Sequence, residues 1–294
     1  MTDSISRRAF TALAGVGSLI HSTALPGMAA AQGSGSGAFS FVQLSDMHWG
    51  YANDTVNPQP AATLARMVET VNALPQRPDF AMFTGDLTHS TDDPGLRRRR
   101  LAEFKEISGR LNVPRLRFMC GEHDAALDRG EAYREFFGEL YYTFDHRGVH
   151  FIVLDNTSDP GAALGEAQLR WLAGDLAQRD REEPIVVFTH RPLFALKPDW
   201  DWATRDGAAA IDMLMPFRHL TVFYGHIHQL HTHHTGHIAH HAAAPLMFAL
   251  STPDQPRKAQ LPWEAARPFQ KLGWRAVALR GSDMPTASEH ALAT

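Results

Sequence analysis

The chain has 294 residues, of which 44% are hydrophobic and 20% are charged, and its formal net charge at pH 7 is -4. This acidic balance argues against binding to nucleic-acid polymers or anionic membranes, because such proteins usually present a basic surface. Cys120 is the only cysteine, so the chain cannot form an intramolecular disulfide. We predict that it packs as a small apolar residue at the end of a strand.

The amino-terminal segment is typical of an export signal. Arg7 and Arg8 precede a stretch of small and apolar residues, and Ala29–Ala31 offers a cleavage site. We predict a twin-arginine signal peptide over residues 1–31 and a Gly/Ser linker over residues 32–38. A retained anchor is the alternative, but a spanning helix needs about 20 apolar residues and this stretch is shorter. Export would place the mature protein in the periplasm or outside the cell, without stable membrane insertion.

Five apolar, strand-forming runs recur along the chain, and a cluster of potential metal ligands follows each. The runs are Phe39–Leu44, Phe80–Thr84, Leu116–Cys120, Ile185–Phe188 and Thr221–Tyr224. The clusters, in the same order, are Asp46-Met47-His48, Gly85-Asp86, Gly121-Glu122-His123-Asp124, Thr189-His190 and Gly225-His226-Ile227-His228. Amphipathic segments separate the runs and no internal repeat is visible, so we predict one α/β domain in the roughly 260 residues after the leader.

The position of these clusters predicts a metal site. In an open α/β sheet, ligands bind beyond the carboxyl ends of the strands, so all five clusters are expected to meet in one place. They supply imidazole and carboxylate groups, which bind transition metals. One polar loop after a buried strand is ordinary, but five in the same context favour a shared site.

One basic run, Arg97–Arg100, lies early in a predicted helix that has Asp92 or Asp93 as its N-cap and Pro94 in its first turn. Consecutive helical residues point in different directions. We therefore interpret the run as a solvated face rather than a recognition patch.

Several histidines and aromatic residues have two readings each. A turn at Thr235-Gly236 predicts a hairpin that carries six histidines: His231, His233, His234, His237, His240 and His241. Their imidazoles either bind metal and phosphate or form only a polar surface. His89 either reaches a metal-bound oxygen or substrate from its loop, or is solvated. Four aromatic residues either wall a substrate pocket or cover a sheet edge, namely Trp49, Tyr51, Trp200 and Trp202.

In their order along the chain, the clusters resemble the calcineurin-like metallophosphoesterase superfamily, whose pattern is D-x-H, G-D, G-N-H-D/E, H and G-H-x-H. The resemblance extends from about Phe39 to about Arg280, with further similarity to the cyclic-nucleotide phosphodiesterase and purple acid phosphatase-like branches around Asp155, Gln168 and Arg191. It implies a four-layer α/β/β/α sandwich with a dinuclear site at the carboxyl ends of the strands. The domain would span residues 39–281, followed by a tail over residues 282–294.

The resemblance also implies roles for single residues. Asp86 would bridge two metal ions, with one ion completed by Asp46, His48 and His228 and the other by Glu122, His190 and His226. Manganese and iron are the expected ions, with zinc as an alternative. His123 would assist the leaving oxygen, and Asp124 would orient His123 and hold it charged. Glu122 departs from the family pattern, which has asparagine there, and makes the site less positive.

These implications lead to one predicted function and two rivals. We expect an exported enzyme that hydrolyses a small-molecule phosphomonoester or phosphodiester by attack of a metal-bound hydroxide. One rival is a non-catalytic binding or scaffold protein of the same fold, although such proteins usually lose ligands or the general-acid histidine. The other is a histidine-rich protein that sequesters metal, which would hold several labile ions rather than two tightly bound ones.

Overall fold

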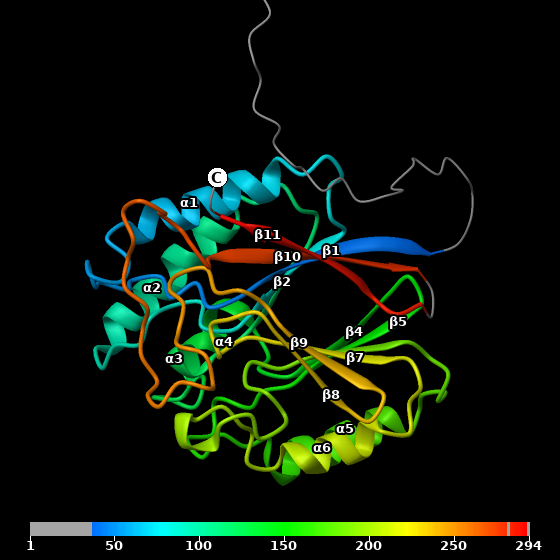
Figure 1. Ribbon diagram of the computed structural model, residues 1–294. Coiled ribbons are helices and arrows are strands. Elements are labelled where there is room, and N and C mark those ends of the chain that lie inside the picture. Colours follow the sequence, from blue (N-terminus) through cyan, green and yellow to red (C-terminus); the bar gives the residue numbers. More distant parts are fainter. Residues whose placement is uncertain (1–36, 281–282, 293–294) are drawn as a thin grey trace, which may run out of the picture. The chain divides into compact units, whose positions relative to one another are not determined.

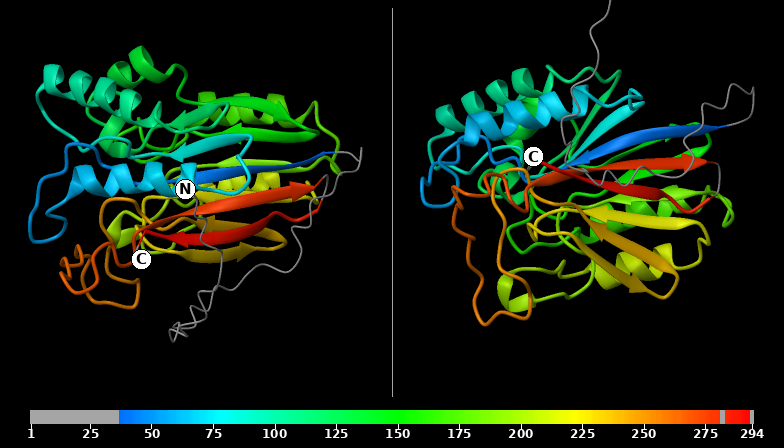
Figure 2. Two further views of the ribbon diagram at one scale, coloured as in Figure 1. Left: turned by 90° about the horizontal axis from the view of Figure 1, so that it is seen from above. Right: turned by 45° about the horizontal axis from the view of Figure 1, so that its top comes forward.

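The computed structural model describes residues 37–280 and 283–292. The predicted signal peptide and most of the predicted linker lie outside the described residues. Two β-sheets lie face to face, and helices cover their outer faces (Figures 1 and 2). This is the four-layer architecture predicted from the sequence. Within the described ranges, no helix combines the length and the apolar character needed to cross a bilayer.

The first sheet has the strand order β11-β10-β1-β2-β3. Its strands are β1 (Ala38–Leu44), β2 (Phe80–Thr84), β3 (Leu116–Met119), β10 (Gly273–Arg280) and β11 (Thr286–Ala291). Strands β1, β2 and β3 are parallel, and β10 and β11 add antiparallel pairs at one edge. The carboxyl ends of β1, β2 and β3 therefore point in one direction.

Strand β11 corrects the predicted carboxyl end of the domain. The sequence predicts a tail over residues 282–294, but Thr286–Ala291 pairs with β10 along its length. The strand is polar and lies at the sheet edge, so it lacks the apolar signal of a core strand. Cross-strand contacts hold it instead: Arg275 Nε donates to Glu289 Oε1 at 2.6 Å, and His290 stacks on Trp274 with ring centroids 4.0 Å apart.

The second sheet has the order β4-β5-β6-β7-β9-β8. Its strands are β4 (Tyr142–His146), β5 (Val149–Val153), β6 (Ile185–Phe188), β7 (Leu220–Tyr224), β8 (His231–Thr235) and β9 (Ile238–Ala242). Strands β5, β6, β7 and β9 are parallel, with β4 and β8 antiparallel at the two edges.

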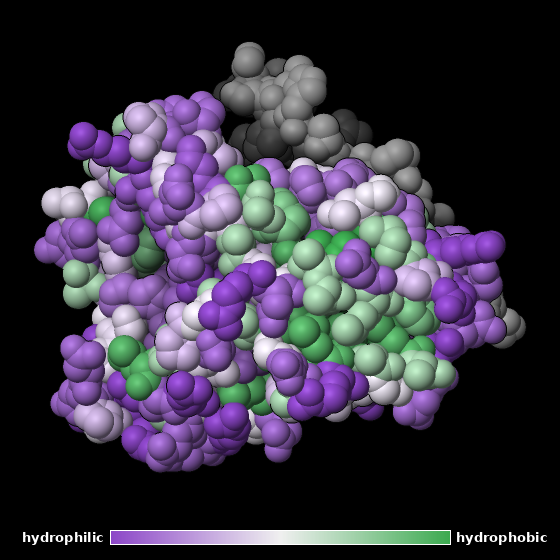
Figure 3. Space-filling view, turned by 90° about the horizontal axis from the view of Figure 1, so that it is seen from below, coloured by the Kyte–Doolittle hydropathy of each residue, from purple (hydrophilic) through white to green (hydrophobic). Residues whose placement is uncertain are grey.

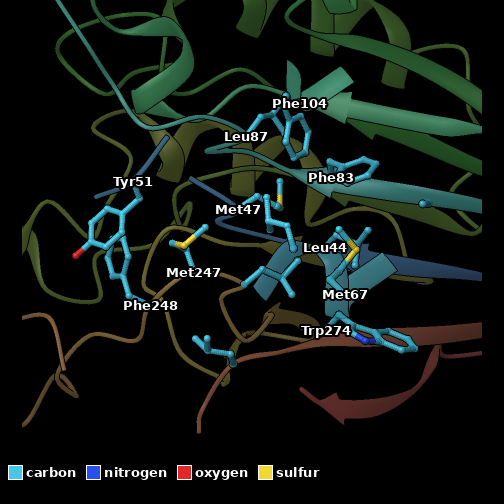
Figure 4. Packing of buried hydrophobic residues seen from close by; sticks show 14 of the residues in the cluster. Leu44, Met47, Tyr51, Met67, Phe83, Leu87, Phe104, Met247, Phe248 and Trp274 are labelled. Carbon is cyan, nitrogen blue, oxygen red and sulfur yellow. The ribbon is translucent and has the colours of Figure 1, made fainter. Parts of the chain in front are cut away.

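The central strands are buried on both faces, so their side chains alternate between two cores. Between the sheets, Phe41 stacks on Phe80 with ring centroids 4.9 Å apart, and Phe151 meets Phe41 edge-on at 6.2 Å. On the opposite face of the first sheet, Leu44 and Phe83 pack toward the helices, as the close view in Figure 4 shows. This alternation explains why the five predicted strands read as continuous apolar runs.

Helices complete the outer layers. They are α1 (Pro60–Asn72), α2 (Pro94–Ser108), α3 (Glu122–Ala125), α4 (Glu131–Phe137), α5 (Gly165–Leu176) and α6 (Gly207–Leu214), with a short 3-10 helix, η1, over Pro198–Trp200. Helices α1 and α2 cover the first sheet, and α5 and α6 cover the second (Figure 1). Viewed from the α5 and α6 side, apolar side chains gather near the centre of the face with hydrophilic ones around them (Figure 3).

Helix α2 begins as predicted, because the Asp93 side chain accepts from the backbone amides of Gly95 and Leu96, and Pro94 follows as the first helical residue. Its arginines point in different directions, but the run is more than a solvated face. Arg97 pairs with Asp128 at 2.7 Å, Arg98 with Glu135 at 2.6 Å, and Arg100 donates to the carbonyl oxygens of His89 and Ser90 at 2.6 and 3.2 Å. The run therefore ties α2 to helix α4, to the loop before it and to the loop that follows β2.

Candidate metal centre

All five predicted clusters lie together at the carboxyl ends of β1, β2, β3, β6 and β7. The His48 amide donates to the Asp86 carbonyl oxygen at 2.8 Å, which joins the loops after β1 and β2. The His226 amide donates to Asp46 Oδ1 at 3.1 Å, which joins the first sheet to the second. The loops of both sheets are thus fixed against each other by backbone groups.

The seven predicted ligands form two adjoining groups. One contains Asp46, His48, Asp86 and His228, and the other contains Glu122, His190 and His226; within each group the candidate ligand atoms lie within 4.8 Å of one another. Asp86 lies at the junction, because its Oδ2 is 3.4 Å from His48 Nε2 and 3.4 Å from His190 Nε2. One carboxylate therefore reaches both groups.

The backbone at these residues is unusual. Left-handed φ angles occur at Asp46 (58°), His48 (42°), Asp86 (51°), His226 (66°) and His228 (52°). Such angles carry strain in residues other than glycine, and they cluster at functional sites where the surrounding structure enforces them. The motif glycines are required for space: a Cβ on Gly121 would lie 2.1 Å from Asp86 Oδ1, and one on Gly225 would lie 2.1 Å from Ser45 Oγ. Gly225 therefore lets two loops approach closely.

Backbone carbonyl groups orient three of the imidazoles. His190 Nδ1 donates to Thr84 O at 2.7 Å, His226 Nε2 to Asp201 O at 2.8 Å, and His228 Nδ1 to Phe248 O at 2.6 Å. A neutral imidazole has only one N–H, so the second nitrogen of each ring keeps a lone pair directed at the cluster. This is the arrangement that metal-binding histidines adopt.

Three buried atoms of the second group, Glu122 Oε2, His190 Nε2 and His226 Nδ1, make no well-aligned hydrogen bond, although His190 Nε2 lies 3.0 Å from Glu122 Oε2 and His226 Nδ1 lies 2.9 Å from Glu122 Oε1. Unpaired polar atoms are costly when buried, and here they converge on one point. Burial opposes a charge on His190, but the Asp86 and Glu122 carboxylates outweigh it and raise the pKa of His190 well above its ordinary value. The position therefore attracts positive charge, and the residues present fit a cation.

The first group also suits a cation. Burial lowers the pKa of His228 to about 4 and that of His48 well below its ordinary value. Both imidazoles are therefore neutral at pH 7 and keep a lone pair for a metal. Burial raises the pKa of Asp46 to about 6, although His190 opposes the shift. A nearby cation would favour the carboxylate form of Asp46.

His123 lies beside the two groups, and its ring centroid is 4.7 Å from the ring centroid of His48. The predicted contact between Asp124 and His123 is not made. Asp124 instead accepts from the backbone amides of Leu87, Thr88 and Gly121 at 2.8 to 2.9 Å. Neighbouring residues on the short helix α3 point in different directions, so one faces the groove while the other turns back to its own loops. Asp124 thus holds the loop that carries Asp86.

Sequence reasoning gave no role to Arg191, which follows His190. Its Nη2 is 3.7 Å from Glu122 Oε2, and its Nη1 donates to Asp201 O at 3.1 Å. Because Asp201 O also accepts from His226, the guanidinium supports the carboxylate and one imidazole of the second group together. Arg191 also offsets part of the negative charge that Glu122 brings to the site. Its position directly after a ligand histidine is the sequence signal that could have pointed to a role in the site.

A groove of about 220 Å³ opens over both ligand groups. Its lining includes His48, Asp86, Glu122 and His123 from the motif loops and Lys258 and Gln260 from the segment 243–272. Phe248 lines it too and stacks on His48 and His228 with ring centroids 4.9 and 4.4 Å apart. The sequence did not single out Phe248, which follows no motif.

The four predicted aromatic residues do not line this groove. Trp202, Trp200 and Tyr51 are buried in the core, and Trp49 Nε1 donates to Glu103 on helix α2 at 2.7 Å. Tyr51 packs behind Phe248, with ring centroids 4.7 Å apart (Figure 4). The structure therefore does not support the reading in which they wall the substrate pocket; three pack in the core and Trp49 contacts helix α2.

The histidine-rich segment forms the predicted hairpin from β8 and β9, with its turn at Gly236-His237. His231, His233 and His240 share the face that meets Phe194. Among the described residues, groups of three or more potential ligands come from the motif loops and His89, and none includes a hairpin histidine. The hairpin thus lacks the ligand groups that the metal-sequestering rival requires.

The calcineurin-like phosphoesterase family matches residues 39–230, the part of the chain that supplies every candidate ligand. The chain belongs to this family. Serine/threonine-protein phosphatase CPPED1 of Mus musculus is 29% identical over 187 residues, which cover 56% of this chain and 60% of that protein. A cAMP/cGMP dual specificity phosphodiesterase of Mycobacterium tuberculosis is 30% identical over 178 residues, which cover 56% of this chain and 53% of that protein. The chain thus spans about half to three-fifths of these two relatives.

Solved structures show the same fold. A dimetal phosphatase from Danio rerio superposes with a TM-score of 0.58 at 14% identity, over 87% of this chain and 100% of that chain. A purple acid phosphatase from yellow lupin superposes with a TM-score of 0.59 at 13% identity, over 88% of this chain and 52% of that chain.

Proposed function

We propose that the protein is a phosphoester hydrolase that uses two metal ions. The position of Asp86 carries this proposal, because its carboxylate lies between two groups of buried ligands whose lone pairs converge. Asp46, His48 and His228 would hold one ion, and Glu122, His190 and His226 the other. Manganese and iron suit this mixture of imidazole and carboxylate, and zinc is the alternative.

When bound, the two cations would activate water at neutral pH and offset the charge of the phosphoryl oxygens. The chain's own residues set where this happens. The carbonyl bonds to His190, His226 and His228 hold each imidazole in a single orientation, so little rearrangement is needed on binding. The groove over the ligands leaves room for a small phosphoester.

His123 is the proposed general acid. The Ser90 hydroxyl lies 3.0 Å from His123 Nδ1 and the Ser90 backbone amide 3.3 Å from it, and of the two only the hydroxyl can accept a proton from Nδ1. His123 lines the groove, where its imidazolium form would pass the Nε2 proton to the leaving oxygen as the phosphorus–oxygen bond breaks. The ring would then be neutral, with its remaining proton on Nδ1 directed at the Ser90 hydroxyl. Ser90, rather than Asp124, is the proposed partner of His123.

Lys258 and Gln260 also line the groove and are proposed to contact the substrate. Lys258 is exposed, and its Nζ donates to Trp200 O at 3.0 Å, which anchors a positive charge there. Gln260 Oε1 accepts from the Tyr51 hydroxyl at 2.9 Å, so its amide group remains free to donate. Both would favour an anionic or hydrogen-bonding group on the substrate.

The test combines metal analysis with a substrate panel. Protein reconstituted separately with manganese, iron and zinc is assayed on nitrophenyl monoesters, nitrophenyl diesters, cyclic nucleotides and phospholipid head groups. We expect about two tightly bound ions per chain and hydrolysis of at least one ester class. Two bound ions without hydrolysis of any ester would favour the non-catalytic rival. Several labile ions would favour sequestration.

We also propose export, on the basis of the predicted signal peptide over residues 1–31, which lies outside the described residues. Arg7 and Arg8 together support it, since the pair is read by a receptor rather than as general charge. Replacing both with lysine should leave unprocessed protein in the cytoplasm, as measured by fractionation and immunoblotting. Normal processing of that variant would indicate general secretion instead.

A further inference from the structure

His89 is held in place rather than solvated. It is half-buried; its amide donates to Trp49 O at 2.9 Å, and Arg100 donates to its carbonyl oxygen at 2.6 Å. Its ring stacks on that of His123 with centroids 4.8 Å apart and meets the Tyr51 ring edge-on at 5.2 Å. These contacts fix both its backbone and its ring.

The fixed ring brings His89 Nδ1 to 3.3 Å from His48 Nδ1. The other nitrogen of His48, Nε2, faces the first ligand group at 3.4 Å from Asp86 Oδ2 and 3.1 Å from His228 Nε2. Nε2 is therefore the atom that can reach a metal. A neutral His48 that offers its Nε2 lone pair must carry its proton on Nδ1, so that proton needs an acceptor.

His190, His226 and His228 each use a backbone carbonyl as that acceptor. His48 Nδ1 instead faces the imidazole of His89. We propose that His89 is a positioning residue for His48: its Nδ1 lone pair accepts the His48 Nδ1–H and keeps the Nε2 lone pair directed at the metal. The inference rests on the proposed dinuclear site and assigns His89 neither ligand nor substrate contact.

Metal binding selects which of the two rings donates in the hydrogen bond between His48 and His89. If His89 donated to His48 Nδ1 instead, the His48 proton would lie on Nε2, aimed at the position of the cation. A cation and that proton exclude each other, so only one tautomer of the pair is compatible with a bound ion. Arg100 of helix α2 holds the His89 carbonyl group, so the His89 ring stays next to His48 Nδ1.

Three substitutions separate this role from simple packing. In His89→Asn the side-chain Oδ1 takes the place of Nδ1 and can still accept. In His89→Gln the oxygen lies farther along the side chain, and His89→Phe keeps the ring but removes the acceptor. His234→Phe is the matched control, because His234 is exposed on the hairpin and belongs to no candidate ligand group.

Affinity is measured without substrate, by chelator competition and by the absorption spectrum of the Co²⁺-substituted protein. We expect His89→Phe to lower the binding affinity for one of the two ions by about 10–100-fold and to change the absorption spectrum of that ion alone. His89→Asn should keep most of the wild-type affinity, His89→Gln should resemble His89→Phe, and His234→Phe should have no effect.

Unchanged affinity in His89→Phe, or equal losses in His89→Phe and His89→Asn, would overturn the proposal. If His89→Phe fails to fold in a thermal melt with chelator present, the comparison of Asn with Gln decides alone, and equal affinities would then count against it. A wild type that binds two ions but hydrolyses no ester would remove the proposed activity and leave this inference standing. A wild type without two ions would remove both.

Discussion

The two walls of the groove are built differently. The ligand wall consists of the motif loops at the strand ends, and its metal-ligand histidines and aspartates are almost wholly buried. The loop wall is the segment 243–272 between β9 and β10, which contains no helix or strand and is drawn in orange in Figure 1. Its first part, residues 243–250, is buried and gives the Phe248 carbonyl to His228, whereas residues 254–260 are exposed and the Lys258 bond to Trp200 O is one of their contacts with the rest of the chain.

This difference separates chemistry from recognition. Parallel strands and backbone hydrogen bonds determine the ligand wall, so its geometry tolerates little change. The loop wall is exposed over residues 254–260, and this part can vary without disturbing the metal ligands, whereas its buried residue Phe248 orients His228. We therefore expect substitutions in the ligand wall to abolish metal binding or hydrolysis, and substitutions in the exposed part of the loop wall to alter substrate affinity.

The largest effect is expected from Asp86→Ala. Because Asp86 reaches both ligand groups, its loss should release both ions and lower activity by at least about 10³-fold. Asp46→Ala is the matched comparison and should release chiefly one ion. Metal analysis of the purified variants measures this. Two ions retained in Asp86→Ala would contradict the bridging role.

The next effect concerns His123→Ala. If His123 donates a proton to the leaving oxygen, esters with alkoxide leaving groups should slow by roughly 10²–10⁴-fold. Nitrophenyl esters should be affected much less, because nitrophenolate needs little protonation, and both ions should remain bound. Steady-state kinetics on the two ester classes measures the contrast. Equal losses in both classes would exclude the general-acid role, and loss of metal would make His123 a ligand.

Glu122→Asn should have a smaller effect that still involves the metals. Losing the carboxylate should weaken retention of the ion held by His190 and His226 by at least about tenfold. It should also shift the pH–rate profile to lower pH, because a more positive site acidifies bound water, and Arg191 would lose its counter-charge. Chelator competition and a pH series measure both. If neither quantity changes, Glu122 does not bind a metal.

The smallest effect is expected from Lys258→Met. Because its charge is exposed, losing its contact with an anionic substrate should raise KM only about two- to fivefold. Metal content and kcat should stay at wild-type values, and Lys271→Met provides a lysine control outside the metal groove. A fall in kcat accompanied by metal loss would mean that the exposed part of the loop wall also supports the metal ligands.

The sequence predicted the strands of the fold well where their burial is complete. Phe80–Thr84 and Ile185–Phe188 have the same limits in the structure, because strands covered on both faces are apolar throughout. Strand β11 was missed, because an edge strand with one exposed face has no such pattern. Its pairing depends on contacts such as Arg275 to Glu289, which join residues of two separate segments.

The sequence by itself determined which residues converge, because motif order and strand ends fix the position of each cluster along the chain. Only the tertiary structure decided what each side chain touches. Asp124 accepts from backbone amides, Arg191 lies beside Glu122, and His89 Nδ1 faces His48 Nδ1. The physical reason is that contact partners are chosen by direction and distance between segments far apart in the chain, such as those of Arg191 and Glu122, and a linear motif carries neither quantity.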